Sequence, residues 1–105
     1  MSAPSGKEPA YQVHWSKAIT HVLRELHRQA SERGMGEQSL SAARALVERL
    51  GSDPLGFGEA CYHLPALELE VRTGIIAPVF VSYGVQREKR LVFVKEVKLL
   101  PGVNP

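Results

Sequence analysis

The chain of 105 residues is poor in cysteine and contains a single one, Cys61. One thiol excludes an internal disulfide framework and indicates a reducing compartment, because small secreted domains are commonly stapled by several disulfides. It also excludes a zinc site built on several thiolates. We interpret Cys61 as a small apolar residue that the core would bury.

A strong charge excess and long apolar runs are absent as well. The sequence has 13 Lys and Arg against 11 Asp and Glu, a net charge of +2. This excess is far weaker than that of a dedicated nucleic-acid-binding domain. The apolar runs are too short to span a membrane, and residues 1–10 have no apolar signal-peptide core. We therefore expect a cytoplasmic protein without a membrane partner.

Several signatures of catalysis are also missing. The sequence has no G-x-S-x-G motif, and "GFGEA" places its glycines too close together for a phosphate-binding loop. No two of the four histidines have the spacing of a helical metal site; they are His14, His21, His27 and His63. His63 and Cys61 lie two residues apart in an expected loop, which is a poor arrangement for a catalytic dyad. We predict no metal and no cofactor.

The length predicts one domain, over residues 11–100, between a flexible N-terminal tail (1–10) and a C-terminal tail (101–105). Alternation in residues 11–15 predicts a short strand, and Ser16 is a suitable N-cap. Apolar residues at helical spacing then predict a helix over 17–33, which the glycines at 34 and 36 end. A second helix is expected from Glu37 or Gln38 to Leu50, stopped by Gly51. Its predicted inward residues are Leu40, Ala43, Leu46, Val47 and Leu50.

In the second half of the chain the apolar period changes from 3.6 to 2. Residues 55–66 read as a loop, 67–72 as a strand, and 73–74 as a turn. Two more strands are expected over 77–85 and 91–100, joined by a charged turn. The last strand is apolar on both faces in its first half, so we expect it to be central. The order β-α-α-β-β-β predicts an α+β fold with a helical hairpin packed on one face of a small, mostly antiparallel sheet.

Two glutamates alternate with leucines in the strand predicted over 67–72. Glu68 and Glu70 would share one face, where two carboxylates can act as a general acid–base pair. The alternation favours a simpler interpretation, the wet face of an amphipathic strand. Arg72 continues that face, and we expect it to pair with Glu70 across one pleat.

The remaining clustered charges lie in the last hairpin. Lys95 and Lys98 are an odd number of residues apart, so they would lie on opposite faces of the last strand. Arg87, Lys89 and Arg90 occupy the preceding turn. Such a cluster favours solubility, with contact to a partner protein or nucleic acid as the alternative.

Over residues 11–100 the sequence resembles the RelE/ParE superfamily of bacterial toxins from type II toxin–antitoxin modules. The resemblance is carried by "YQVHWSKAITHVLREL", "DPLGFGEACYHLPALELEVRTG" and "VFVSYGVQREKRLVFVKEV". Arg72 and Tyr83 fall where the family pattern has Arg and Tyr. The resemblance implies a RelE/ParE-like fold and a growth inhibitor that a cognate antitoxin protein neutralises by wrapping across the sheet and helical hairpin. One branch of the family cleaves mRNA on the ribosome without a metal, and another poisons DNA gyrase.

The sequence departs from the cleaving branch, whose cationic cluster would stabilise the charge of a phosphoryl-transfer transition state. Glu68 and Glu70 stand at the positions of the family's lysines, Phe80 at that of an arginine, and Leu100 where the C-terminal basic residues belong. Carboxylates repel a phosphodiester. The resemblance therefore favours a toxin or toxin-derived protein that acts mainly by protein binding. The partner-binding candidates are Glu68, Glu70, Arg72, Arg87 and Arg90.

Two alternatives stay open. The first is a metal-free mRNA endoribonuclease with a rearranged site, for which the candidate residues are Arg72, Lys95, Lys98 and Tyr83. The second is a small interaction module unrelated to toxins.

Overall fold

The computed structural model describes residues 10–100, which form two α-helices and five strands. The elements in chain order are β1 (Gln12–His14), α1 (Lys17–Glu32), α2 (Gly36–Ser52), β2 (Glu59–Leu64), the 3-10 helix η1 (Pro65–Leu67), β3 (Leu69–Ile76), β4 (Val79–Gln86) and β5 (Leu91–Leu99). The tails expected over 1–10 and 101–105 lie, apart from Ala10, outside the described residues.

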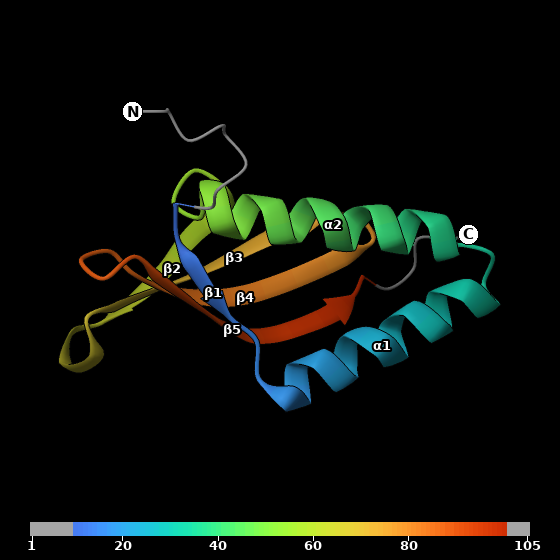
Figure 1. Cartoon of the computed structure of the whole chain (residues 1–105), viewed down its shortest axis with the longest axis horizontal. Helices are drawn as coiled ribbons and strands as arrows, with labels where there is room; N and C mark the ends of the chain where they lie inside the picture. The colour runs from blue at the N-terminus through green and yellow to red at the C-terminus, as the bar shows by residue number, and fades with distance from the viewer. Residues whose placement is uncertain (1–9, 101–105) are drawn as a thin grey trace, which may run out of the picture.

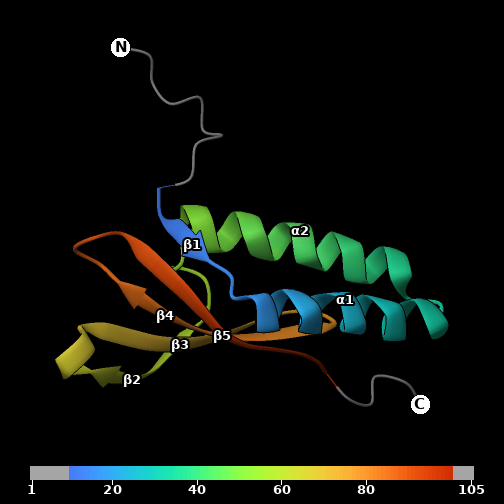
Figure 2. The ribbon, with the colours of Figure 1, turned by 60° about the horizontal axis from the view of Figure 1, so that its bottom comes forward.

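The five strands form one sheet in the order β1-β5-β4-β3-β2. β1 runs parallel to β5, and the other neighbours are antiparallel. Both helices lie on the same side of this sheet (Figures 1 and 2). The α+β class and the helical hairpin on a mostly antiparallel sheet are therefore confirmed, with one strand more than expected.

α1 begins at Lys17 as predicted, whereas α2 begins at Gly36, just before the predicted start, and its buried stripe agrees with the prediction only in part. Ser16 caps α1, and its Oγ accepts a hydrogen bond from the Ile19 amide at 3.0 Å. α2 continues through Gly51 to Ser52, so the prediction that Gly51 stops this helix is wrong. The prediction that Leu40 and Val47 point inward is wrong, since they are 44% and 52% exposed. The inward position predicted for Leu46 and Leu50 is confirmed, and Ala42 completes a buried stripe that recurs every four residues.

The segment predicted as a loop contains a strand, and the turn predicted at 73–74 is not there. β2 occupies Glu59–Leu64, and the chain turns between β3 and β4 at 77–78. Gly74 serves packing inside β3, because a Cβ at this position would lie 2.5 Å from Cζ of Phe57. Leu67, predicted to begin the strand over 67–72, lies in η1 and is 59% exposed.

The core lies between the helices and one face of β4 and β5. Val79, Val81, Tyr83 and Val85 share that face, as predicted, and each is nearly or fully buried. β5 lies between β1 and β4, which confirms the expectation of a central strand. The residues that the helices and the loop before β2 contribute to this core include Ile19, Leu46, Leu50 and Phe57.

The strand register defines two faces, which we name for use below. The residues on the helix-side face are Glu70, Arg72 and Gly74 of β3, then Val79, Val81, Tyr83 and Val85 of β4, and Val92, Val94 and Val97 of β5. The open face carries Tyr62 of β2, Val71, Thr73 and Ile75 of β3, Phe80, Ser82 and Gly84 of β4, and Phe93 and Lys98 of β5. The far ends of the β2–β3 and β4–β5 hairpins project beyond the helices (Figure 1). No helix among residues 10–100 is long and apolar enough to cross a bilayer.

Candidate functional site

Three charged side chains meet at the end of the helix-side face. Arg72 of β3 donates a hydrogen bond from Nη1 to Oε2 of Glu70, and Arg87 donates from Nη2 to Oε1 of the same carboxylate at 2.8 Å. The side chains of Arg72 and Glu70 are only 10% and 17% exposed, whereas Arg87 is 63% exposed. The predicted pairing of Arg72 with Glu70 is confirmed, and Arg87 joins it from the next hairpin.

Arg72 and Tyr83 hold the loop that joins α2 to β2. These two residues are paired across β3 and β4. Arg72 Nη2 donates to the carbonyl oxygens of Leu55 and Gly58 at 2.8 and 2.9 Å. The Tyr83 hydroxyl lies 2.7 Å from the carbonyl oxygen of Pro54 and 3.2 Å from that of Phe57. Four carbonyl groups of residues 54–58 are thus satisfied by two side chains of the sheet.

The electrostatics of this network favour the charged forms of its ion pairs. Hydrogen bonds from Arg87 and then Arg72 lower the pKa of Glu70, although burial opposes them. Burial works to lower the pKa of the Arg72 guanidinium, but the hydrogen bond to Glu70 leaves that pKa raised. Burial also raises the pKa of the Tyr83 phenol. Arg72 in its charged form and Tyr83 in its neutral form therefore donate the hydrogen bonds that hold the loop between α2 and β2 against the sheet.

The expectation of a solvated face for Glu68, Glu70 and Arg72 is wrong for two of the three. Glu70 and Arg72 lie on the helix-side face, where the loop after α2 covers Arg72. Glu68 lies at the end of η1 in the left-handed conformation (φ 54°) and is exposed. The sequence pattern marks polar residues, but it does not reveal that a loop folds over them.

Both lysines of β5 lie on the open face, which corrects the prediction that they point to opposite sides. The pairing of β4 with β5 shifts between Ser82 and Tyr83, whose partners are Glu96 and Val94. Lys95 is therefore an extra residue in a β-bulge, and the alternation is interrupted between the two lysines. A bulge of this kind cannot be read from residue spacing alone.

Each of these lysines lies over an aromatic ring of another strand, Lys98 over a ring of the adjacent β4 and Lys95 over a ring of β2. Lys95 Nζ is 5.5 Å from the ring centroid of Tyr62 and 3.0 Å from its hydroxyl. Lys98 Nζ is 4.9 Å from the ring centroid of Phe80. These distances are those of cation–π pairs. Further along the same face, His14 stacks on Phe93 with ring centroids 5.1 Å apart. The open face is thus a row of aromatic rings with two ammonium groups above it.

Cys61 is exposed, so the prediction that the core buries it is wrong. It lies where the register between β2 and β3 shifts, which puts its thiol 3.6 Å from the Thr73 hydroxyl. This bulge also explains why β2 was missed, because it disturbs the period of two in "EACYHL". Tyr62, the ring under Lys95, was missed with it.

A small pocket lies on the helix-side face where the hairpins project beyond the helices. Its volume is about 180 Å³, and it is lined by His63, Glu68, Glu70, Val85, Gln86, Arg87 and Glu88. Arg90, the other predicted partner-binding arginine, ends the β4–β5 turn with φ 55° and is exposed. Within residues 10–100 no group of three or more His, Cys, Asp or Glu side chains is placed to hold a metal ion.

The four candidate residues for a rearranged catalytic site do not share one surface. Arg72 and Tyr83 are buried on the helix-side face, with 8% and 0% exposure. Lys95 and Lys98 are exposed on the other face. Any chemistry on the open face would therefore depend on the lysines and not on Arg72.

Comparison of the chain with protein-family models, curated proteins and solved structures finds no match.

Proposed function

We propose that this chain is a RelE/ParE-like toxin, or a protein derived from one, that acts by binding another protein and is neutralised by a cognate antitoxin. The observation that carries the proposal is the open face of the sheet. The helices leave this face uncovered, yet it bears rings and aliphatic groups of the kind that bind proteins. Aromatic residues are enriched at protein interfaces, and tyrosine is enriched among their hot spots.

The exposed apolar side chains support a binding surface on and beside the open face. Tyr62 and Ile75 are 51% and 56% exposed, and Leu67 at the adjacent hairpin end is 59% exposed. Lys95 and Lys98 lie on the same face, and so does the exposed Glu96, which is paired with Ser82. The complementary partner surface is therefore apolar, with charged groups of both signs at its rim.

The partner-binding candidates now divide into two groups. Arg72 and Glu70 stabilise the fold and are not free to bind a partner. Glu68, Arg87 and Arg90 lie at the projecting ends of the hairpins, where they form a charged rim. The cellular target, DNA gyrase or the ribosome with its mRNA, is an extension of the resemblance and belongs to the same proposal.

A second candidate function is a metal-free endoribonuclease, and one observation favours it. The bulge at Lys95 brings two ammonium groups to the same face, each beside a ring on which a base can stack. Fixed cations stabilise the charge of a phosphoryl-transfer transition state. This site would differ from the family's cluster, since it has no arginine and no buried acid or base beside the lysines.

Expression of the chain from an inducible promoter in a bacterium tests both candidates. A protein-binding toxin should arrest growth, and Tyr62→Ala with Ile75→Ala should relieve the arrest while the purified variant stays folded by circular dichroism. Lys95→Ala with Lys98→Ala should abolish RNA cleavage if the second candidate is correct. Arg24→Ala, a change on the exposed side of α1, is the matched control and should leave arrest intact.

Unchanged growth on expression of the wild-type chain would contradict the hypothesis of an active toxin and leave that of a toxin-derived binding protein. The second hypothesis is tested by co-expression with the product of any adjacent short gene that encodes a DNA-binding N-terminus. Co-purification in a defined ratio supports the antitoxin relationship. No such neighbour, or no complex with it, would favour an interaction module unrelated to toxins.

A further inference from the structure

The outer edge of the sheet is unpaired at the end of β3. β2 pairs with β3 only from Leu69 to Thr73, whereas β4 pairs with it as far as Ile76. Residues 74–76 therefore have a neighbouring strand on one side only. An unpaired edge of this kind is a template for an added strand.

The backbone of Ile75 faces this free edge. A Cβ at Gly58 would lie 2.4 Å from the carbonyl oxygen of Thr73, so the Thr73 carbonyl points outward, toward the chain that leads into β2. Backbone groups of alternate residues in a strand point to the same side. The N–H and C=O of Ile75 are thus directed outward, where none of the described strands pairs with them, and its side chain is 56% exposed.

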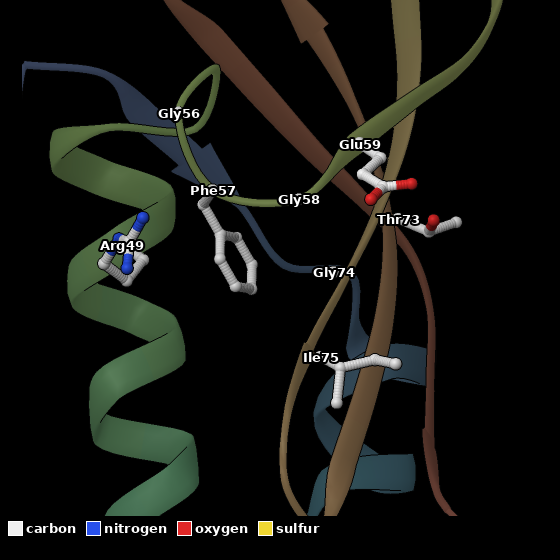
Figure 3. Close-up of a pocket in the computed structure, with 8 residues that line it drawn as sticks. All are labelled: Arg49, Gly56, Phe57, Gly58, Glu59, Thr73, Gly74 and Ile75. Atoms are coloured by element: carbon white, nitrogen blue, oxygen red, sulfur yellow. The ribbon is translucent and has the colours of Figure 1, made fainter.

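Two hollows lie along the seam between this edge and α2, each of about 450 Å³. The first, which we call the Arg49 hollow, includes Arg49, Phe57, Gly74 and Ile75. Figure 3 shows Arg49 on α2 and the Phe57 ring lying between the helix and Gly74. The second, the Glu37 hollow, is lined by Glu37, Gln38, Ser41, Ala42, Ala45, Ile76 and Ala77.

The two hollows differ in charge, because Glu37 is the only charged residue that lines one of them, whereas Arg49 and Glu59 both line the other. The distance between Glu37 and Arg49 is one that an extended segment can span. Glu37 and Arg49 are 12 positions apart in one helix, about 18 Å along its axis. An extended chain covers this length in five or six residues. The Arg49 guanidinium lies 5.2 Å from the Phe57 ring centroid and makes only a 4.0 Å contact with Asp53, so it can accept a carboxylate from a partner.

We infer that this seam is a docking site for an extended segment of a partner protein, which adds to β3 as a strand at Ile75. The segment carries a basic residue for Glu37 and an acidic residue for Arg49. Antiparallel addition is the more stable ladder and matches the other neighbours of β3, so the basic residue comes first in the segment. The inference rests on the proposed protein-binding function and specifies the chemistry of the partner.

Two blocked peptides of identical composition provide the test. Acetyl-Lys-Thr-Val-Thr-Val-Glu-amide has the inferred charge order, and acetyl-Glu-Thr-Val-Thr-Val-Lys-amide has the reverse order. Titration into the full chain, followed by amide NMR, should show about tenfold tighter binding of the first peptide, from two exposed ion pairs. It should also slow hydrogen exchange of the Ile75 amide. Two N-methylated versions of the first peptide complete the test, each methylated on one of the two alternating sets of backbone nitrogens. The version that loses the N–H groups facing β3 should show neither the tighter binding nor the slowed exchange.

A charge swap in the protein sharpens the test. Glu37→Lys with Arg49→Glu should reverse the preference between the two peptides, while Arg24→Glu on α1 should leave it unchanged. Peptides that do not protect the Ile75 amide at millimolar concentration, or a preference that ignores the swap, would overturn the docking site.

The outcome is separable from that of the proposed function. If growth arrest depends on Tyr62 while the peptides fail to bind, only the docking site is lost. If the peptides bind as inferred while the chain neither arrests growth nor forms a complex with a neighbouring gene product, the toxin–antitoxin assignment is lost and the docking site remains.

Discussion

The two faces of the sheet use positive charge in opposite ways. On the helix-side face, Arg72 is 8% exposed and its guanidinium is bound by a carboxylate and two carbonyl groups. On the open face, Lys95 and Lys98 are exposed and lie over the rings of Tyr62 and Phe80. A buried cation whose two Nη groups donate to a carboxylate and to carbonyl groups holds the chain together, although the Nε of Arg72 has no hydrogen-bond partner. A cation above an exposed ring remains available to a ligand.

This difference has an energetic consequence that mutation can measure. Removing one member of a buried charge network leaves the others desolvated without partners, which typically costs 3–5 kcal/mol. Removing an exposed cation costs about 1 kcal/mol or less. Substitutions on the two faces should therefore separate into those that unfold the protein and those that change only its binding.

Arg72→Ala should give the largest effect, a loss of about 3–5 kcal/mol in the free energy of unfolding. The substitution leaves the carbonyl groups of Leu55 and Gly58 and the carboxylate of Glu70 without this partner. Urea unfolding followed by circular dichroism measures the loss, with Lys98→Ala on the open face as the control. Equal stabilities of the two variants would contradict the division between the faces.

Gly58→Ala should be the next most damaging change, at about 2–4 kcal/mol. Gly58 has φ +73°, and an added Cβ would lie 2.4 Å from the Thr73 carbonyl oxygen and 2.8 Å from the Tyr83 hydroxyl. Gly34 is a matched control, since it has φ +77° but no atom within 4 Å of such a Cβ. Gly34→Ala should cost only the conformational part, about 1–2 kcal/mol. If thermal unfolding ranks the two variants in the opposite order, the loop between α2 and β2 is not tightly packed around Gly58.

Much of this architecture could be predicted from the sequence, because the apolar period reports which side of an element is buried. The cap at Ser16, the two helices and the inward valines beside Tyr83 all follow from local spacing. The β2 strand and the shared face of Lys95 and Lys98 do not, since each depends on a β-bulge. A bulge adds one residue to a strand, and its position is decided by the pairing with the neighbouring strand.

The roles of the glutamates and of Arg72 were beyond the sequence for another reason. Alternation with leucines correctly placed Glu70 and Arg72 on the same face. The burial of that face depends on the loop before β2, whose carbonyl groups need donors once they are folded inward. Arg72 and Tyr83 supply those donors from residues 14 to 29 positions away in the chain. Contacts at such separations leave no mark in a local pattern.

Glu70 provides a pH test of the helix-side network. Its pKa is lowered in the folded protein, so its contribution to stability is fully present above the unfolded value of about 4.3 and is lost as pH falls through the folded value. Glu70→Gln should therefore destabilise the protein by about 1–3 kcal/mol at pH 7. The gap between wild type and variant should close on acidification below pH 4. Glu68→Gln, at an exposed position, is the control. A stability difference between wild type and Glu70→Gln that does not depend on pH would show that the ion pairs of Glu70 do not stabilise the fold.

The open face should give the smallest effect on stability. Lys95→Ala removes a hydrogen bond to the Tyr62 hydroxyl and a cation–π contact, both exposed, and should cost no more than about 1 kcal/mol. Tyr62→Phe keeps the ring and removes only the hydroxyl, so it separates the two contributions in the same unfolding measurement. A loss at Lys95 as large as that at Arg72 would mean that the open face is also a structural surface. A small loss of stability, combined with weakened partner binding or reduced growth arrest, would instead show that Lys95 contributes to binding and not to the stability of the fold.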